Sequence, residues 1–243
     1  MMRKIALGCL LLAAASVASA TTTFIAQGTS SGGNSVYAEA DFTFSNNLLT
    51  LTLTNLLVNP ANAAQNISDF EFTIASLSGT TATLTPYTGA STNTKAPQLV
   101  TITGPGYTVT SNGSAGYDPG WAFAYSSGNF ALDALAGSVN GPAYTIVGPP
   151  GASGYTNANS SLTNGAHNPM IYQSATWVFN VVNPGGSVLN ITNVNFSFGT
   201  TAGNDYTCDA SHNFCAAVPE PGSWLLLGSG LAILLFFARK RTA

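Results

Sequence analysis

Positive charge is almost missing from this chain except at its two ends. Of the six lysines and arginines in 243 residues, only Lys95 lies between the terminal clusters. The stretch 21–217 sets this one lysine against eight acidic residues, which gives a net charge near −7. Binding to nucleic acid or to anionic lipid needs clustered lysine and arginine. The composition therefore argues against nucleic acid as a partner and against docking on an anionic membrane.

Cysteine is also scarce, with three in the chain. Cys9 lies in the N-terminal apolar run, so Cys208 and Cys215 are the pair left to the body. In an oxidising compartment such a close pair predicts a local disulfide. A metal site is the alternative, because Asp209 and His212 lie between the two thiols, but the spacing is wider than zinc sites use. Free or intermolecular thiols are the third possibility, and we expect no metal.

The N-terminus has the three parts of a secretory signal peptide. Two basic residues open the chain, an apolar run follows at 5–15, and Ala18 and Ala20 supply the small side chains that signal peptidase requires. We expect cleavage after Ala20, which removes residues 1–20. An uncleaved anchor is the alternative, but the apolar run is shorter than the ~20 residues that a membrane span needs.

A second apolar run lies close to the C-terminus. Residues 223–238 carry no charge and begin with Ser-Trp224. As a helix this run would be about 24 Å long, slightly shorter than a ~30 Å hydrocarbon core. Arg239, Lys240 and Arg241 follow it, and basic flanks stay in the cytoplasm. The pattern predicts a transmembrane helix whose preceding body is translocated.

The segment in front of this run reads Pro219-Glu220-Pro221. The two prolines cannot continue a helix and hold the backbone extended just outside the bilayer. Together with the apolar run and the basic cluster, this segment resembles the sorting signal of PEP-CTERM proteins over residues 218–243. An ordinary single-pass anchor with an accidental Pro-Glu-Pro is the alternative.

The resemblance implies a route rather than an activity. In that family a membrane-embedded exosortase recognises the Pro-Glu-Pro segment and cuts near it, in Gram-negative bacteria. It implies that signal peptidase and the secretion machinery act first, and that the inner membrane holds the C-terminal helix while the body lies in the periplasm. The protein would then pass to the cell surface or outside the cell, and exopolysaccharide is the partner that the family suggests.

The body, 21–217, shows period-two hydrophobic alternation and no convincing helical period. We expect strands at 36–44, 49–54, 70–74, 99–102, 177–181 and 194–198, and weaker ones at 81–87, 107–110, 122–125 and 144–147. This pattern predicts one all-β domain, an antiparallel β-sandwich of jelly-roll type. The expected core residues are Phe42, Phe44, Leu49, Leu51, Leu53, Phe70, Phe72, Ile74, Trp177, Phe179, Phe196 and Phe198.

The connections are marked by glycine, proline, asparagine and serine. Residues 45–47 and 183–186 have the composition of tight turns between strands. Residues 148–168 read as a long surface loop. The best candidate for a short helix is 129–137.

A catalytic nucleophile finds little support. Residues 28–32 match the G-x-S-x-G pattern around Ser30, but a nucleophile elbow needs a strand followed by a helix. Here another strand follows, so a surface turn is the better interpretation. His167 and His212 are the two histidines, and their spacing pairs neither with a nucleophile.

Carboxylates separated by two residues share one face of a strand, as in Glu39 with Asp41 and Asp69 with Glu71. Such pairs could support glycoside hydrolysis or calcium binding, or simply form the solvated face of a strand. We favour the solvated face, and we expect no enzymatic activity and no cofactor.

The sequence leaves three functions for the body. The first is a non-catalytic envelope or biofilm-matrix component, the second a carbohydrate-binding module and the third a secreted hydrolase. Exposed aromatic rings stack on sugars, and the principal candidates are Trp121, Tyr117 and Tyr125. Tyr155 and Tyr172 are further candidates. Burial of these rings would instead assign them to the core.

Overall fold

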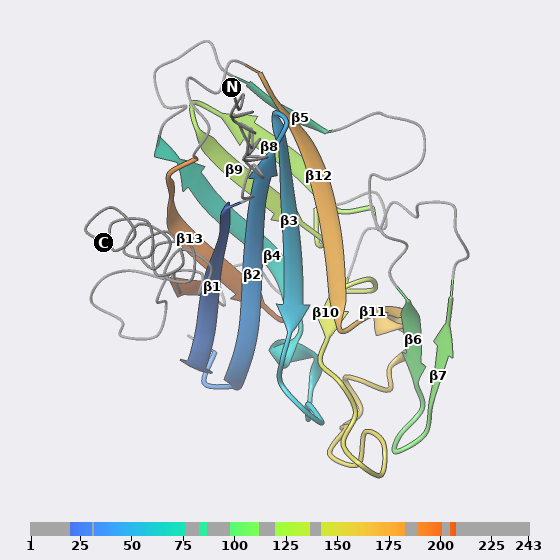
Figure 1. Ribbon diagram of the computed structural model, residues 1–243. Coiled ribbons are helices and arrows are strands. Elements are labelled where there is room, and N and C mark those ends of the chain that lie inside the picture. Colours follow the sequence, from blue (N-terminus) through green and yellow to red (C-terminus); the bar gives the residue numbers. More distant parts are fainter. Residues whose placement is uncertain are drawn as a thin grey trace, which may run out of the picture.

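The computed structural model describes residues 20–30, 32–75, 83–86, 98–111, 120–136, 142–182, 189–200 and 205–207. This part of the chain is mostly β-strand, with short 3-10 turns such as η1 (Ala63–Gln65) and η3 (Gly165–His167). The strands form two sheets that lie face to face (Figure 1).

The first sheet, sheet A, has five antiparallel strands in the order β1-β2-β3-β12-β5. They are β1 (Ala20–Thr29), β2 (Ser35–Ser45), β3 (Leu48–Asn55), β12 (Ser174–Val182) and β5 (Thr83–Pro86). In β3, and in β2 from Val36 to Phe42, every second side chain is buried, which is the alternation that the sequence predicts.

The tight turn between β2 and β3 falls at the expected place. Asn46 and Asn47 have φ angles of 52° and 61°. Positive φ at both central residues is the geometry of a type I′ turn, whose twist matches that of paired strands. Asparagine tolerates this region better than most side chains do, so the predicted turn at 45–47 is confirmed.

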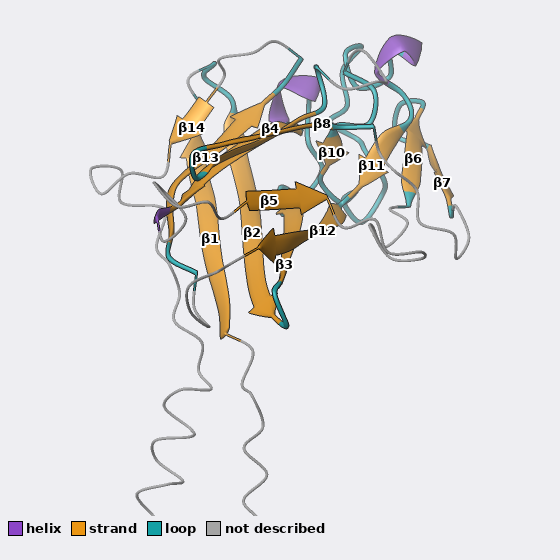
Figure 2. Cartoon of the chain, turned by 90° about the horizontal axis from the view of Figure 1, so that it is seen from above, coloured by secondary structure: helices purple, strands orange, loops and turns teal. Residues whose placement is uncertain are grey.

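The second sheet, sheet B, has nine strands in the order β14-β13-β4-β10-β11-β6-β7, with β9 on β4 and β8 on β9. The long strands are β4 (Ile67–Ile74) and β13 (Ile191–Phe198). The others are β6 (Leu99–Ile102), β7 (Tyr107–Thr110), β8 (Ala122–Ser126), β9 (Asn129–Asp133), β10 (Ile146–Val147), β11 (Met170–Tyr172) and β14 (Asp205–Thr207). Figure 2 shows β4, β8 and β13 on the side opposite β1, β2 and β3.

The main core joins the inner faces of both sheets through aromatic rings. Phe42 of β2 lies 4.8 Å from Phe72 of β4, centroid to centroid, in an edge-to-face contact. At the other end, Phe179 of β12 lies 4.9 Å from Phe130 of β9. Edge-to-face pairs add to the stabilisation that area burial provides. The expected core residues are buried, except that Phe44 is half-buried and packs against the cluster.

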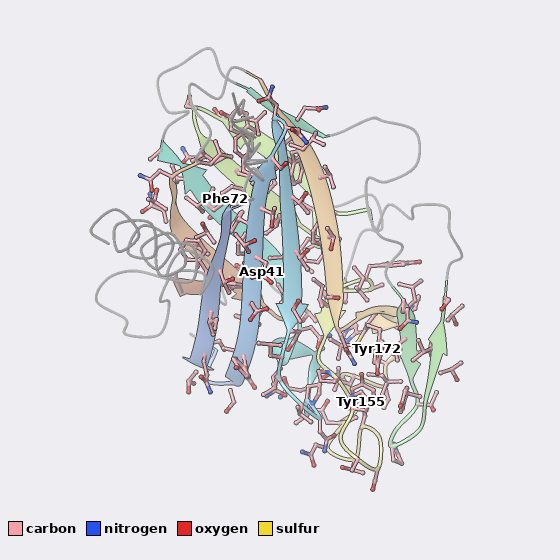
Figure 3. The ribbon with its side chains drawn as sticks, viewed as in Figure 1. Asp41, Phe72, Tyr155 and Tyr172 are labelled. Atoms are coloured by element: carbon pink, nitrogen blue, oxygen red, sulfur yellow. The ribbon has the colours of Figure 1, made fainter. Side chains whose placement is uncertain are left out.

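A second, smaller core lies at the end of sheet B that carries β6 and β7. It contains Val100, Ile102, Val147 and Met170 from the strands, and Tyr155 and Leu162 from the connection 148–168. Figure 3 shows Tyr155 and Tyr172 at this end, well away from Phe72. The expectation of a simple surface loop is therefore incomplete, because two fully buried side chains anchor this connection.

Two further expectations need correction. Residues 129–133 form strand β9, not a helix, because Phe130 and Leu132 alternate with outward-facing neighbours and the backbone pairs with β4 and β8. The fold is also not purely antiparallel, because β10 and β11 run parallel. The expected turn at 183–186 lies outside the described residues.

Candidate functional sites

Sheet B carries a hollow of about 410 Å³ on strands β4, β8 and β9, next to β13. Two adjacent cross-strand rows of residues form it. One row is Ala124 opposite Ala131, which lies opposite Glu71. The next row has Asn129 opposite Thr73. Alternation places these residues on the face away from the core, because Phe72 and Phe130 between them are buried.

The hollow exists because small side chains stand where neighbouring strands carry longer ones. Ala124 and Ala131 leave the space, and Glu71 and Asn129 border it. The lining residues are Glu71, Phe72, Thr73, Ala124, Tyr125, Ser126, Asn129, Phe130, Ala131 and Asn193.

One hydroxyl group holds two amides in line across three strands at this site. The Thr73 hydroxyl donates to Oδ1 of Asn129 at 2.9 Å. Nδ2 of Asn193 donates to the same Thr73 oxygen at 3.3 Å. The Thr73 side chain thus fixes which atom of each amide points toward it and which points away.

A β-bulge brings Asn193 into this row. The register of β13 against β4 shifts between Thr192 and Asn195, so β13 carries one extra residue there. Asn193 takes a left-handed backbone conformation, with φ of 50°. Bulges of this kind redirect a side chain and are frequent beside functional sites.

The electrostatics of the hollow are simple. Glu71 is the one carboxylate among the lining residues, and it is exposed. The described part of the chain contains no lysine or arginine. The hollow is therefore hydrogen-bonding and mildly anionic.

The structure places the predicted sugar-stacking residues in different surroundings. Trp121 is only 7% exposed, its indole N–H donates to the Tyr144 carbonyl at 2.9 Å, and its ring lies 5.1 Å from that of Trp177. By the exposure criterion Trp121 belongs to the core. Tyr125 is half-buried, lies opposite the buried Phe130 and packs against the main core, so its ring is on the core side of β8 and not on the face that carries the hollow. Tyr117 lies outside the described residues.

The two further aromatic candidates belong to the second core. Tyr155 is fully buried, and its hydroxyl donates to the Gly148 carbonyl at 2.8 Å. Tyr172 is half-buried and packs against the same cluster. Neither ring offers an open face to a sugar of the kind that the lectin hypothesis requires.

The Glu39 and Asp41 pair lies on the outer face of sheet A, as its spacing predicts. Both side chains are partly exposed, and the Thr23 hydroxyl donates to Asp41 (Figure 3 labels Asp41). Burial, then the charge of Asp41 and a hydrogen bond to it, raise the pKa of Glu39 above its usual value.

The Asp69 and Glu71 pair shares the outer face of β4. Only Glu71 borders the hollow, while Asp69 lies opposite Asp133 of β9. Asp133 in turn accepts hydrogen bonds from the backbone N–H groups of Leu135 and Ala136. Among the described residues no group of three or more histidine, cysteine or acidic side chains is arranged to hold a metal ion.

The residues considered for nucleophilic chemistry, Ser30 and His167, each lie in a turn or loop and make hydrogen bonds within it. Ser30 is buried in the turn between β1 and β2, where its hydroxyl accepts a hydrogen bond from the Asn34 N–H at 3.4 Å. Strand β2 follows directly, so the strand-to-helix elbow is absent at this position. Nδ1 of His167 lies 2.6 Å from the Ser161 carbonyl oxygen, in the connection 148–168.

The addressing signals lie mostly outside the described residues. This applies to Ala18, Pro219, Glu220, Pro221, Arg239, Lys240 and Arg241. The body residues Cys208, Cys215 and His212 also lie outside the described residues. Strand β1 begins at Ala20, so the first strand starts at the expected cleavage site. No helix within the described ranges is long and apolar enough to span a membrane.

Comparison with known proteins identifies the tail. Residues 217–241 match the family described as the PEP-CTERM protein-sorting motif. No curated protein and no solved structure matches the chain. The chain thus carries a PEP-CTERM sorting motif, and this motif indicates a protein that is exported and sorted by an exosortase at the membrane.

Proposed function

We propose that this protein is a non-catalytic component of the cell envelope or of the exopolysaccharide matrix, with a β-sandwich ectodomain that an exosortase processes. The observation that carries the proposal is the sorting motif at 217–241, attached to a two-sheet body that contains one lysine. The motif gives the route, and the uncharged polar surface suits a body that remains outside the cell.

The proposed route has two cuts. Signal peptidase removes residues 1–20 after the chain crosses the inner membrane, which leaves Thr21, the second residue of strand β1, at the new N-terminus. The basic cluster 239–241 keeps the C-terminus in the cytoplasm. The exosortase next cuts near Pro219-Glu220-Pro221 and frees the body from the inner membrane.

A non-catalytic body agrees with the chemistry of the hollow. Glycoside hydrolysis ordinarily uses two carboxyl groups on opposite sides of the scissile bond. Within the described residues, Glu71 alone supplies a carboxyl group to the hollow. A carbohydrate-binding body is the second candidate function, and the hydrogen-bonded row of Asn129, Thr73 and Asn193 at the hollow favours it over a hydrolase.

The route is tested by deleting Pro219-Glu220-Pro221 in the native host and following the body by immunoblotting of cell fractions. We expect the deletion variant to stay in the inner membrane at full length, while the unaltered protein loses its tail. Deletion of Thr242 and Ala243 is the control, because both residues lie beyond the matched motif. Normal release of the Pro-Glu-Pro deletion variant would contradict exosortase sorting.

The destination is tested on the released protein. Matrix is separated from medium and from outer membrane, and we expect the body in the matrix or on the cell surface. Recovery of all released protein as a free species in the medium would refute the matrix role and leave the sorting route intact.

A further inference from the structure

We propose that the hollow on β4, β8 and β9, with the β13 bulge at its edge, binds a neutral glycan. This inference rests on the proposed function, because that function places the body among polysaccharides. It adds the class of ligand and the residues that would hold it, namely Glu71, Thr73, Asn129 and Asn193.

The size and wall of the hollow fit a small piece of a sugar chain. Its volume of about 410 Å³ lies within the range of small-ligand sites. The alanine pair Ala124 and Ala131 leaves the middle open, so a ring can approach the sheet closely. The hollow has a floor of small side chains and a polar edge, because Tyr125 lies opposite the buried Phe130 and packs against the main core instead.

The polar row presents the donors and acceptors that sugar hydroxyls need. Because Oδ1 of Asn129 accepts from Thr73, the two hydrogens of its Nδ2 face away from that bond. Because Nδ2 of Asn193 donates to Thr73, its Oδ1 remains an acceptor. Neighbouring hydroxyls of a sugar donate and accept at once, so they match an amide N–H beside an acceptor oxygen.

The charge of the site selects against acidic ligands. Glu71 adds a negative charge and a pair of strong acceptor oxygens, and no lysine or arginine lies in the described part of the chain. A uronic acid, sulfate or phosphate would bring a second negative charge to a site without a compensating cation. A single carboxylate also supplies too few oxygens for calcium. The ligand class that remains is an uncharged, hydroxyl-rich glycan.

Two substitutions test the site in different ways. Ala131→Leu fills the hollow from a position facing away from the core, and Thr73→Val removes the hydroxyl group while keeping a β-branched side chain in the strand. Thr52→Val is the matched control. Its hydroxyl group makes an equivalent cross-strand hydrogen bond with Thr176, at 2.8 Å, on the outer face of sheet A.

Binding is measured on the mature secreted protein with dextran, mannan and galactan as neutral probes and alginate as the acidic probe. We expect at least one neutral polysaccharide to bind and alginate not to bind. Ala131→Leu should weaken binding by at least about tenfold, and Thr73→Val by about three- to tenfold, the effect of losing hydrogen bonds. Thr52→Val should stay within about twofold, since it leaves every lining residue in place.

The outcome separates the site from the proposed function. Binding should change little with salt, because no ion pair contributes. Failure of all neutral probes, preference for alginate or for a peptide, or equal binding by Ala131→Leu would overturn the site. A protein that reaches the matrix without such binding keeps the proposed function and loses this site. A protein that binds the neutral probe but never leaves the inner membrane would support this site and contradict the proposed function.

Discussion

Replacing Tyr155 with phenylalanine probes the second core at its one buried hydroxyl group. Tyr155 is fully buried, and its hydroxyl donates to the Gly148 carbonyl at 2.8 Å. Phenylalanine keeps the ring and its edge-to-face contact with Tyr107, at 5.3 Å, but leaves the Gly148 carbonyl without this donor. An unpaired buried acceptor costs about 1–3 kcal/mol. We therefore expect the free energy of unfolding to fall by about 1–2 kcal/mol at neutral pH.

The same variant has a second signature at high pH. Burial, then the charges of Tyr172 and Tyr107, raise the pKa of the Tyr155 hydroxyl above its ordinary value. The folded state therefore keeps this proton at a pH where the unfolded chain has lost it. Stability from this group is complete below about pH 10, the pKa of an unfolded tyrosine, and falls by up to about 1.4 kcal/mol per pH unit above it.

The Tyr155→Phe variant does not lose this stability. The difference in free energy of unfolding between the unaltered protein and the variant should therefore become smaller as the pH rises. Urea unfolding, followed by tryptophan fluorescence at about pH 8 and about pH 11, measures it, and the gap should shrink by about 1 kcal/mol or more. Tyr37→Phe is the control, because Tyr37 is partly exposed on the outer face of sheet A, and a surface change stays within about 0.5 kcal/mol. A gap that is constant with pH, or equal narrowing in the control, would refute this account of Tyr155.

Two further predictions concern other parts of the chain. Peptide mapping of the native secreted protein without reductant should link Cys208 to Cys215, and two alkylatable thiols would contradict the disulfide. Asp41→Asn should lower the pKa of Glu39 in a carbon NMR titration, because it removes the neighbouring charge. Asp133→Asn on the other sheet should leave that titration unchanged, and an unchanged Glu39 in Asp41→Asn would show that burial alone causes the shift.

The strands that the sequence predicts well are those with one clearly buried face. In β3 (Leu48–Asn55), Leu49, Leu51 and Leu53 alternate with threonines, and these three leucines are buried. A period of two needs no knowledge of the partner strand, so this pattern suffices to assign the strand. For strand β9 (Asn129–Asp133) the sequence predicts a helix wrongly, because the stretch 129–137 is rich in alanine and leucine, which favour a helix. Pairing with β4 and β8 overrides that local preference.

The candidate glycan site, in contrast, could not be predicted from the sequence. The aromatic residues that the sequence suggests do not form this site, because Tyr125 packs against the main core. No local pattern marks Thr73, Asn129 and Asn193. These three come from strands that are 56 and 120 residues apart in the chain. Their meeting depends on the register of three strands and on a one-residue bulge. Period and composition specify which face a residue occupies, but not which strand lies beside it.

The sequence does not predict the second core either, for a related reason. The connection 148–168 is rich in glycine and asparagine, a composition typical of exposed loops. Here glycine serves close packing, since a Cβ on Gly148 would lie 2.0 Å from the Leu57 carbonyl oxygen. The backbone can therefore approach β3 and its continuation closely, and Tyr155 and Leu162 fill the space beneath the loop.

The charge distribution links the address of this protein to the ligand that we propose for it. Nearly all its cations lie in the two terminal signals, which the two proposed cuts remove. The body that remains has a net charge near −7 and is repelled by anionic lipid and acidic polymer alike. Retention outside the cell then needs contacts that do not depend on charge attraction. Hydrogen bonding to a neutral glycan meets this requirement, and the described hollow offers it from strands that pack on the aromatic core.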